Sequence, residues 1–165
     1  MIRLTLGAFA LSLLAAPVLA QEAQRVISLG GSVTEIAVAL GAQDRLIARD
    51  TTSNYPPAIE DLPDVGYIRA LSPENVLALS PDLIIAEGDA GPPEAVEVLK
   101  SAGIPFALMP EANGPDAIPA KIAAVAEALG KVDEGKALSA TVSAGLEEAK
   151  ARAAAVAAPK RVLFI

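Results

Sequence analysis

The sequence predicts an α/β fold built on a parallel sheet, and two observations lead to this expectation. Between residues 25 and 129, short apolar runs alternate with segments in which apolar residues recur every three or four positions. Glycine, proline and serine stand at most of the boundaries between these segments. The 165 residues include no cysteine and no histidine, which excludes disulfides, zinc sites with thiolate or imidazole ligands and a Ser-His-Asp triad. Strands that alternate with helices pair in parallel through right-handed crossovers.

The predicted elements follow in a regular order. Residues 25–29 predict a buried strand, and Gly30-Gly31 turns the chain into a helix with Ser32 as its N-cap and Glu35 completing a capping box. The later elements are a strand at 46–49, a short helix after Ser72, a strand at 82–87, a helix at 93–103, a strand at 105–109 and a helix at 116–129.

The first 20 residues have the features of a cleavable signal peptide. Arg3 provides the positive end, an apolar core follows, and Val18-Leu19-Ala20 forms a small-residue cleavage site. This core is too short to span a bilayer, so we expect a periplasmic protein without a stable membrane anchor. Removing residues 1–20 leaves 12 basic residues against 20 acidic ones, a net charge of about −8, because only Arg3 is lost. Such an acidic protein is a poor partner for nucleic acid.

The pattern changes after residue 131. Residues 21–131 predict a Rossmann-like N-terminal α/β lobe that binds the ligand, whereas residues 132–158 lack strand and turn signals and predict one long inter-lobe helix. From 132 to 157 this helix is roughly 39 Å long, more than a crossover needs. Residues 159–165 begin an apolar strand that the chain leaves unfinished. We therefore expect the N-terminal part of a longer protein, with the first strand of a missing second lobe at its end.

A candidate binding site lies at residues 66–74. In an extended segment, residues two apart point the same way, so Tyr67 and Arg69 are expected to share one face. Ser72 is a suitable N-cap, Pro73 suits the first helical position and Glu74 lies in the favourable first turn. Open α/β sheets bind ligands at such strand-to-helix corners. A loop tyrosine that packs on its neighbours beside two solvated charges is the alternative.

The chain resembles the periplasmic haem-binding proteins of bacterial ABC importers, within the wider class whose two lobes are joined by one long helix. The resemblance covers residues 25–165 and rests on these segments: SLGGSVTE at 28–35, TTSNYPP at 51–57, GYIRALSPE at 66–74, LSPDLI at 79–84 and GPP at 91–93.

The resemblance implies a binding protein rather than an enzyme, which captures haem b in its ferric form and delivers it to an inner-membrane ABC permease. Tyr67 is then the axial iron ligand, and Arg69 pairs with the phenolate or with a haem propionate. Gly91 and Pro92 belong to a loop that covers the macrocycle. Glu74 is the carboxylate that docks on an arginine of the permease. A tyrosine with a pKa near 10 binds as phenolate at neutral pH only beside a strong cation, which ferric iron provides.

Three alternatives stay open. The same class of binding protein takes cobalamin or a ferric siderophore, and only Tyr67 and Arg69 favour haem. Gly30-Gly31-Ser32, with Asp50 about 20 residues later, faintly resembles a dinucleotide-binding unit of an exported NAD-type oxidoreductase, but the third glycine is absent. A truncated gene product without activity of its own is the third.

Overall fold

The computed structural model describes residues 22–111, 114–158, 160, 161 and 163. The predicted signal peptide lies outside these residues, as does most of the strand predicted at 159–165. Four parallel strands form one sheet in the order β2-β1-β3-β4. Their bounds are β1 (Val26–Leu29), β2 (Leu46–Arg49), β3 (Leu83–Ala86) and β4 (Phe106–Leu108). The expected α/β fold with a parallel sheet is confirmed.

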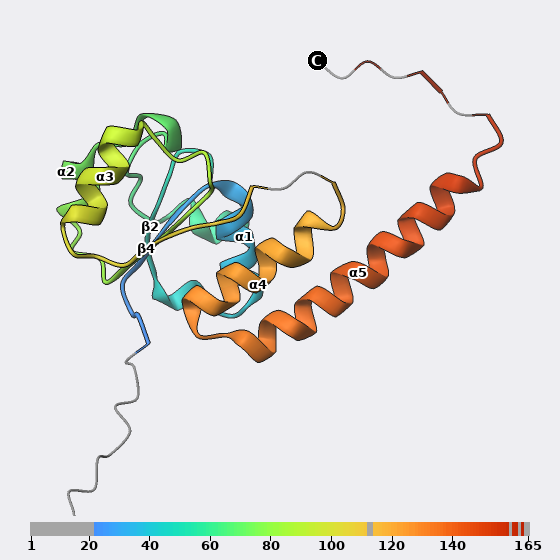
Figure 1. The fold of residues 1–165 in the computed structure, drawn as a ribbon, viewed down its shortest axis with the longest axis horizontal. Coiled ribbons are helices and arrows are strands. Elements are labelled where there is room, and N and C mark those ends of the chain that lie inside the picture. Colours follow the sequence, from blue (N-terminus) through green and yellow to red (C-terminus); the bar gives the residue numbers. More distant parts are fainter. Residues whose placement is uncertain (1–21, 112–113, 159, 162, 164–165) are drawn as a thin grey trace, which may run out of the picture.

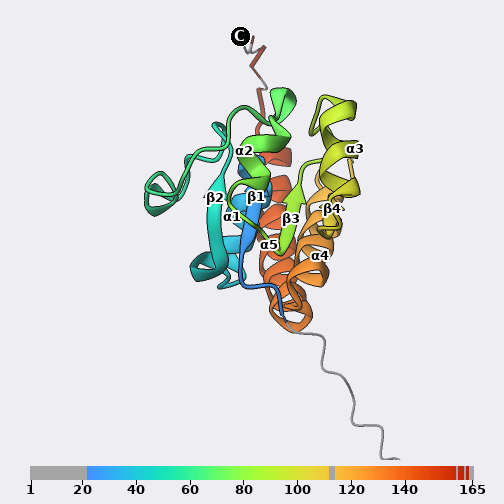
Figure 2. The ribbon, with the colours of Figure 1, turned by 90° about the vertical axis from the view of Figure 1, so that its left-hand side faces the viewer.

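Each face of the sheet is covered by helices, as a buried parallel sheet requires. One layer contains α1 (Gly31–Ala39) and α4 (Ala117–Leu129), and the other contains α2 (Pro73–Leu77) and α3 (Pro93–Ser101) (Figures 1 and 2).

Successive residues of the central strands alternate between these two layers. Val26 of β1 packs in the cluster formed with α1 and α4, whereas Ile27 packs in the cluster formed with α2 and α3. In β3, Ile85 and Ile84 divide in the same way. All residues of β1 and β3 are buried. The period of two residues therefore gives the sheet two separate apolar cores.

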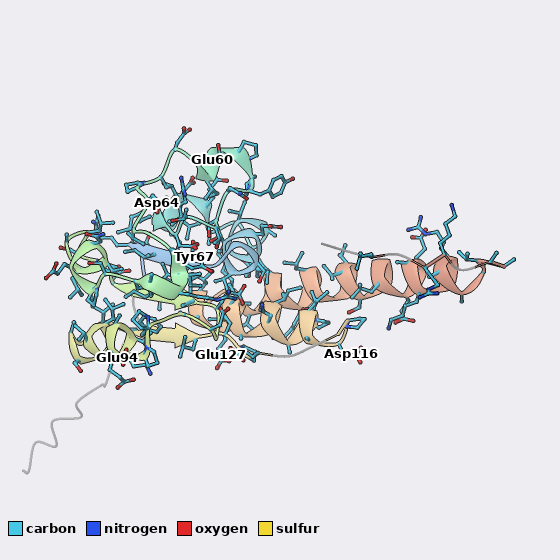
Figure 3. All side chains as sticks on the ribbon, turned by 90° about the horizontal axis from the view of Figure 1, so that it is seen from above. Glu60, Asp64, Tyr67, Glu94, Asp116 and Glu127 are labelled. Atoms are coloured by element: carbon cyan, nitrogen blue, oxygen red, sulfur yellow. The ribbon has the colours of Figure 1, made fainter. Side chains whose placement is uncertain are left out.

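The helix α5 (Val132–Ala154) packs against α4 and continues beyond the sheet (Figures 1 and 3). Its 23 residues give a length of about 34 Å. Gly135 permits the close approach to α4, because a Cβ atom at this position would lie 2.4 Å from the Cβ of Ala126. The role of α5 as a link between two lobes stays a prediction. No helix in the described part of the chain has the length and apolar character to cross a membrane.

One predicted helix start is wrong. The N-cap of α1 is Gly30 rather than Ser32, and no side chain caps this helix. Gly30 has φ 108°, a conformation that favours glycine. Ser32 lies inside the first turn and donates its hydroxyl hydrogen to Glu87 instead. The cap predicted for α2 is confirmed, since Asn75 N–H donates to Ser72 Oγ over 3.4 Å.

Candidate functional site

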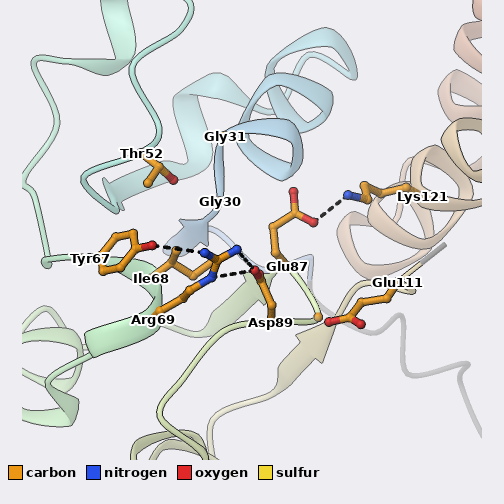
Figure 4. Close-up of a pocket in the computed structure, with 11 residues that line it drawn as sticks. Gly30, Gly31, Thr52, Tyr67, Ile68, Arg69, Glu87, Asp89, Glu111 and Lys121 are labelled. Atoms are coloured by element: carbon orange, nitrogen blue, oxygen red, sulfur yellow. Dashed lines mark hydrogen bonds and ion pairs between the residues drawn. The ribbon is translucent and has the colours of Figure 1, made fainter. Parts of the chain in front are cut away.

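A pocket of about 710 Å³ opens at the carboxyl-terminal edge of the sheet (Figure 4). This is where open parallel sheets bind ligands, because the loops that follow the strands converge there. The segment that follows each strand contributes to the lining. These residues are Gly30 and Gly31 after β1, Thr52, Tyr67, Ile68 and Arg69 after β2, Glu87, Gly88 and Asp89 after β3, and Glu111 after β4. Lys121 of α4 completes the lining.

The structure brings Tyr67 and Arg69 together, as predicted, but by a different backbone. Residues Ile68–Ala70 form a turn of 3-10 helix rather than an extended strand. Arg69 Nη1 nevertheless lies 3.3 Å from Tyr67 Oη, so that the guanidinium donates to the phenol oxygen. Tyr67 lines the pocket and is exposed, with 44% of the residue's full accessible area. A phenol oxygen next to a permanent cation is therefore presented to the pocket.

Asp89, which the sequence analysis missed, holds Arg69 in place. Its Oδ2 accepts a hydrogen bond from Arg69 Nε at 2.8 Å and a second, short one from Nη2. The hydrogen bond to Asp89 and its negative charge raise the pKa of Arg69. Both side chains are largely exposed, so this ion pair orients the guanidinium of Arg69 but adds little to the stability of the fold.

The loop that contains Gly91 and Pro92 is tied to the same corner. Gly91 N–H donates to the carbonyl of Ile68, and Leu71 N–H donates to the carbonyl of Gly91, both over 2.9 Å. On this loop the pocket is lined by Gly88 and Asp89, rather than by the residues predicted. A ligand contact of Gly91 and Pro92 stays a prediction.

Lys121 and Glu87 of the pocket lining form a second polar cluster with Ser32, which the sequence analysis also missed. Lys121 Nζ donates to Glu87 Oε2 over 2.6 Å and to Ser32 Oγ over 3.0 Å. Two sequence signals were available for these contacts. Glu87 directly follows a predicted strand, and Lys121 is the one basic residue of the helix predicted at 116–129.

Asp50 is fully buried behind the pocket wall. Its Oδ1 accepts from Gly30 N–H at 2.8 Å and from Ser53 Oγ at 2.6 Å, and Oδ2 accepts from Thr52 N–H and Oγ1. Burial raises the pKa of Asp50, but these hydrogen bonds outweigh it and hold the pKa below the ordinary value. With its lone pairs occupied inside the wall, Asp50 cannot bind a ribose, which removes the residue on which the dinucleotide hypothesis relied.

Glu74 is exposed in the first turn of α2 and does not line the pocket. Its docking role stays a prediction. Among the described residues, no group of three or more acidic side chains is arranged to hold a metal ion.

Residues 26–165 match the family model described as periplasmic binding protein. The chain belongs to the periplasmic binding protein family. The expected resemblance is thereby confirmed at the level of the class.

Three proteins similar to this chain are named after the ligands that they bind, which are haem and vitamin B12. The periplasmic heme-binding protein RhuT from Roseiflexus sp. RS-1, solved in its apo form, has 39% sequence identity to this chain. The two structures superpose with a TM-score of 0.80, over 82% of this chain and 52% of RhuT. The periplasmic vitamin B12-binding protein BtuF of Vibrio cholerae is 30% identical with a TM-score of 0.71, over 81% and 52%. A vitamin B12-binding protein of Yersinia pestis (strain Pestoides F) is 42% identical over 96 residues, which are 58% of this chain and 34% of the relative.

This periplasmic binding protein thus spans about a third of the length of its curated relative and about half of the two solved structures. All three relatives are binding proteins, which supports a binding protein over an enzyme at a coarse level. Overall similarity does not separate haem from vitamin B12, so the choice of ligand depends on the site.

Proposed function

We propose that this chain binds ferric haem in the periplasm, as part of the substrate-binding component of an ABC importer. The observation that carries the proposal is the exposed phenol of Tyr67, with the guanidinium of Arg69 3.3 Å from its oxygen, at the ligand-binding edge of the sheet. The likeness to RhuT, at 39% identity over 82% of this chain, supports the same ligand. RhuT and BtuF are named as periplasmic proteins, which supports export by residues 1–20.

The chemistry of the corner suits ferric iron. Ferric iron stabilises the phenolate form of Tyr67, and the positive charge of Arg69 acts in the same direction. Asp89 accepts hydrogen bonds from Nε and Nη2 of Arg69, so the remaining nitrogen, Nη1, is directed at Tyr67. An arginine fixed in this way stabilises the phenolate when iron binds, or pairs with a haem propionate beside it.

Delivery to the permease is assigned to Glu74. This residue is exposed on the short helix that follows the Tyr67 corner, so a partner can reach it while the pocket is occupied. In this proposal an arginine of the permease pairs with the carboxylate of Glu74.

Cobalamin is the second candidate, and the vitamin B12-binding relative at 42% identity favours it. Titration of the purified chain with hemin and, separately, with cyanocobalamin separates the two. Haem binding is expected to produce a high-spin spectrum of the tyrosinate type, because no histidine or cysteine is present in the sequence to replace Tyr67. Saturable binding of cyanocobalamin without binding of hemin would contradict the proposal.

A further inference from the structure

Two basic side chains reach the pocket from opposite helical layers of the fold. Arg69 follows Ile68, which packs in the cluster under α2 and α3. Lys121 belongs to α4, whose Val125 packs with α1 in the cluster on the other face of the sheet. Figure 4 shows the two side chains on either side of the loop that follows β3. A ligand in the pocket therefore lies between them.

The loop after β3 supplies one acidic partner to each cation. Glu87 accepts from Lys121 Nζ at 2.6 Å, and Asp89, two residues later, accepts from Arg69 Nε at 2.8 Å. Glu111 adds a third carboxylate to the lining. The lining holds three carboxylates against two cations, so Lys121 offsets part of the repulsion that an anionic ligand would meet.

Lys121 is held in the pocket wall rather than extended into solvent. Its side chain is 24% exposed, compared with 73% for Lys136 on α5. Ser32 of α1 and Glu87 fix its ammonium group from two other segments. Glu87 itself lies directly over Gly30, where a Cβ atom would come within 2.1 Å of Glu87 Cγ. The glycine turn at Gly30 therefore leaves room for Glu87, which in turn positions the ammonium group of Lys121. Because this group is partly desolvated, its electrostatic interactions are stronger than those of a lysine in solvent.

The ammonium group retains capacity for a ligand. A lysine side chain can donate three hydrogen bonds, and Lys121 donates two within the described part of the chain. Arg69 likewise directs three of its five N–H groups to Asp89 and Tyr67 among the described residues. Both cations line the same pocket, so both can donate to an anionic group of its ligand.

We propose that Lys121 binds a carboxylate of the ligand, with Glu87 and Ser32 positioning its ammonium group. The inference rests on the proposed function, because the carboxylate is then a propionate of haem. It adds a ligand contact from the helical layer opposite to Tyr67 and Arg69.

The test compares hemin with hemin dimethyl ester, which keeps the iron and the macrocycle but has no carboxylate. Both are titrated by visible absorbance in the same detergent solution against the full chain and three variants. In Lys121→Gln the charge is removed, and in Lys121→Arg it is kept. Lys131→Gln is the matched control, because Lys131 is 25% exposed and paired with Glu134 at 3.0 Å but lies outside the pocket.

Lys121→Gln is expected to weaken hemin binding by about tenfold, the effect of one lost charge-assisted hydrogen bond. It should leave binding of the ester unchanged, which also shows that the variant is folded. Lys121→Arg keeps the charge but not the compact ammonium group, so it should lose less hemin affinity than Lys121→Gln. Lys131→Gln should bind hemin as the unmodified chain does. Equal hemin affinity in Lys121→Gln, or an equal loss for hemin and ester, would overturn this inference alone. Failure to bind either compound, both by the unmodified chain and by a chimera in which the remaining part of RhuT follows α5, would overturn the proposed function and the inference with it.

Discussion

The guanidinium of Arg69 lies 3.3 Å from the phenol oxygen of Tyr67, although the chain turns through a 3-10 helix between the two residues. The contact does not arise from the backbone alone. Asp89, which is 20 residues away in sequence, accepts two hydrogen bonds from the same guanidinium and directs it across the pocket mouth. The loop after β3 therefore determines how the corner after β2 presents its cation.

Tyr67→Phe should remove the tyrosinate-type spectrum of the hemin complex and weaken binding by about tenfold or more. The substitution deletes the phenol oxygen and retains the ring, so it separates iron ligation from packing. Tyr55→Phe is the matched control, because Tyr55 is the other tyrosine of the sequence. It is 60% exposed and does not line the pocket. An unchanged spectrum in Tyr67→Phe, with the loss found in Tyr55→Phe, would assign the iron to Tyr55.

Asp50→Asn should lower the free energy of unfolding at pH 7 by about 2–3 kcal/mol, since an amide cannot accept all of the hydrogen bonds that the buried carboxylate accepts. The pKa of Asp50 in the folded protein lies below its ordinary value of 3.8. The stability gained from ionisation is therefore present above that value and is lost as the pH falls through the folded pKa.

The difference between the unmodified chain and Asp50→Asn should accordingly shrink below about pH 3.8. Chemical unfolding at pH 7 and at several lower values measures this. The exposed Asp61 provides the control, and Asp61→Asn should change stability little at any of them. A difference that stays constant down to the lowest pH at which the chain folds would show that Asp50 acts through shape rather than charge.

Gly135→Ala should destabilise the chain by about 1–3 kcal/mol, although alanine is the better helix former. Its Cβ would lie 2.4 Å from the Cβ of Ala126, so α4 and α5 must move apart. Gly145→Ala in the same helix meets nothing within 4 Å and should stabilise by about 0.5–1 kcal/mol. Thermal unfolding of the two variants compares them directly. Equal stabilisation in both would mean that α5 does not pack on α4 at Gly135.

The sequence predicts the fold well because the strands are short, apolar and separated by turn residues. Ile27 and Ile84 are found in the central strands where the pattern indicates them. The prediction that Ser32 is the N-cap of α1 was wrong for a local reason. Gly30 adopts a positive φ, which moves the helix start towards it and releases Ser32 to bind Glu87.

Of the charged and aromatic residues that line the pocket, the sequence analysis predicted Tyr67 and Arg69 but not Glu87 and Lys121 on its other side. Tyr67 and Arg69 are two residues apart in sequence, so their proximity could be predicted although the backbone between them is a 3-10 turn. The contact between Glu87 and Lys121 joins residues 34 apart, and it depends on how α4 crosses the sheet. Periodicity indicates that α4 exists and which of its faces is buried, but it does not say which loop its polar residues meet.

Glu74→Ala should leave hemin binding unchanged and weaken transport or association with the permease. The carboxylate in the first turn of α2 contributes at most about 1 kcal/mol to the helix, so the variant should remain folded. Glu94→Ala is a suitable control, because Glu94 occupies the equivalent position in the first turn of α3 and is also exposed. Normal transport by Glu74→Ala would leave this residue with a role at the helix start alone.

The last prediction concerns the part of RhuT that has no counterpart here, since the chain covers 52% of that protein. The resemblance to two-lobed binding proteins implies a ligand gripped between two lobes. Tyr67, Arg69 and the loop after β3 are predicted to belong to the first of them. One lobe covers one face of a flat macrocycle. At about 25 cal/mol per Å² of apolar area, losing half of the cover costs several kcal/mol, or orders of magnitude in affinity.

The 165-residue chain should therefore bind hemin far more weakly than a chimera in which the remaining part of RhuT follows α5. It should also self-associate, because apolar side chains at and beyond the end of α5 are exposed, with Val156 at 56% and Leu163 at 82%. Hemin titration and sedimentation of both proteins test the two expectations. A monomeric 165-residue chain with the affinity of the chimera would show that one lobe suffices, and that the pocket between Arg69 and Lys121 encloses the ligand by itself.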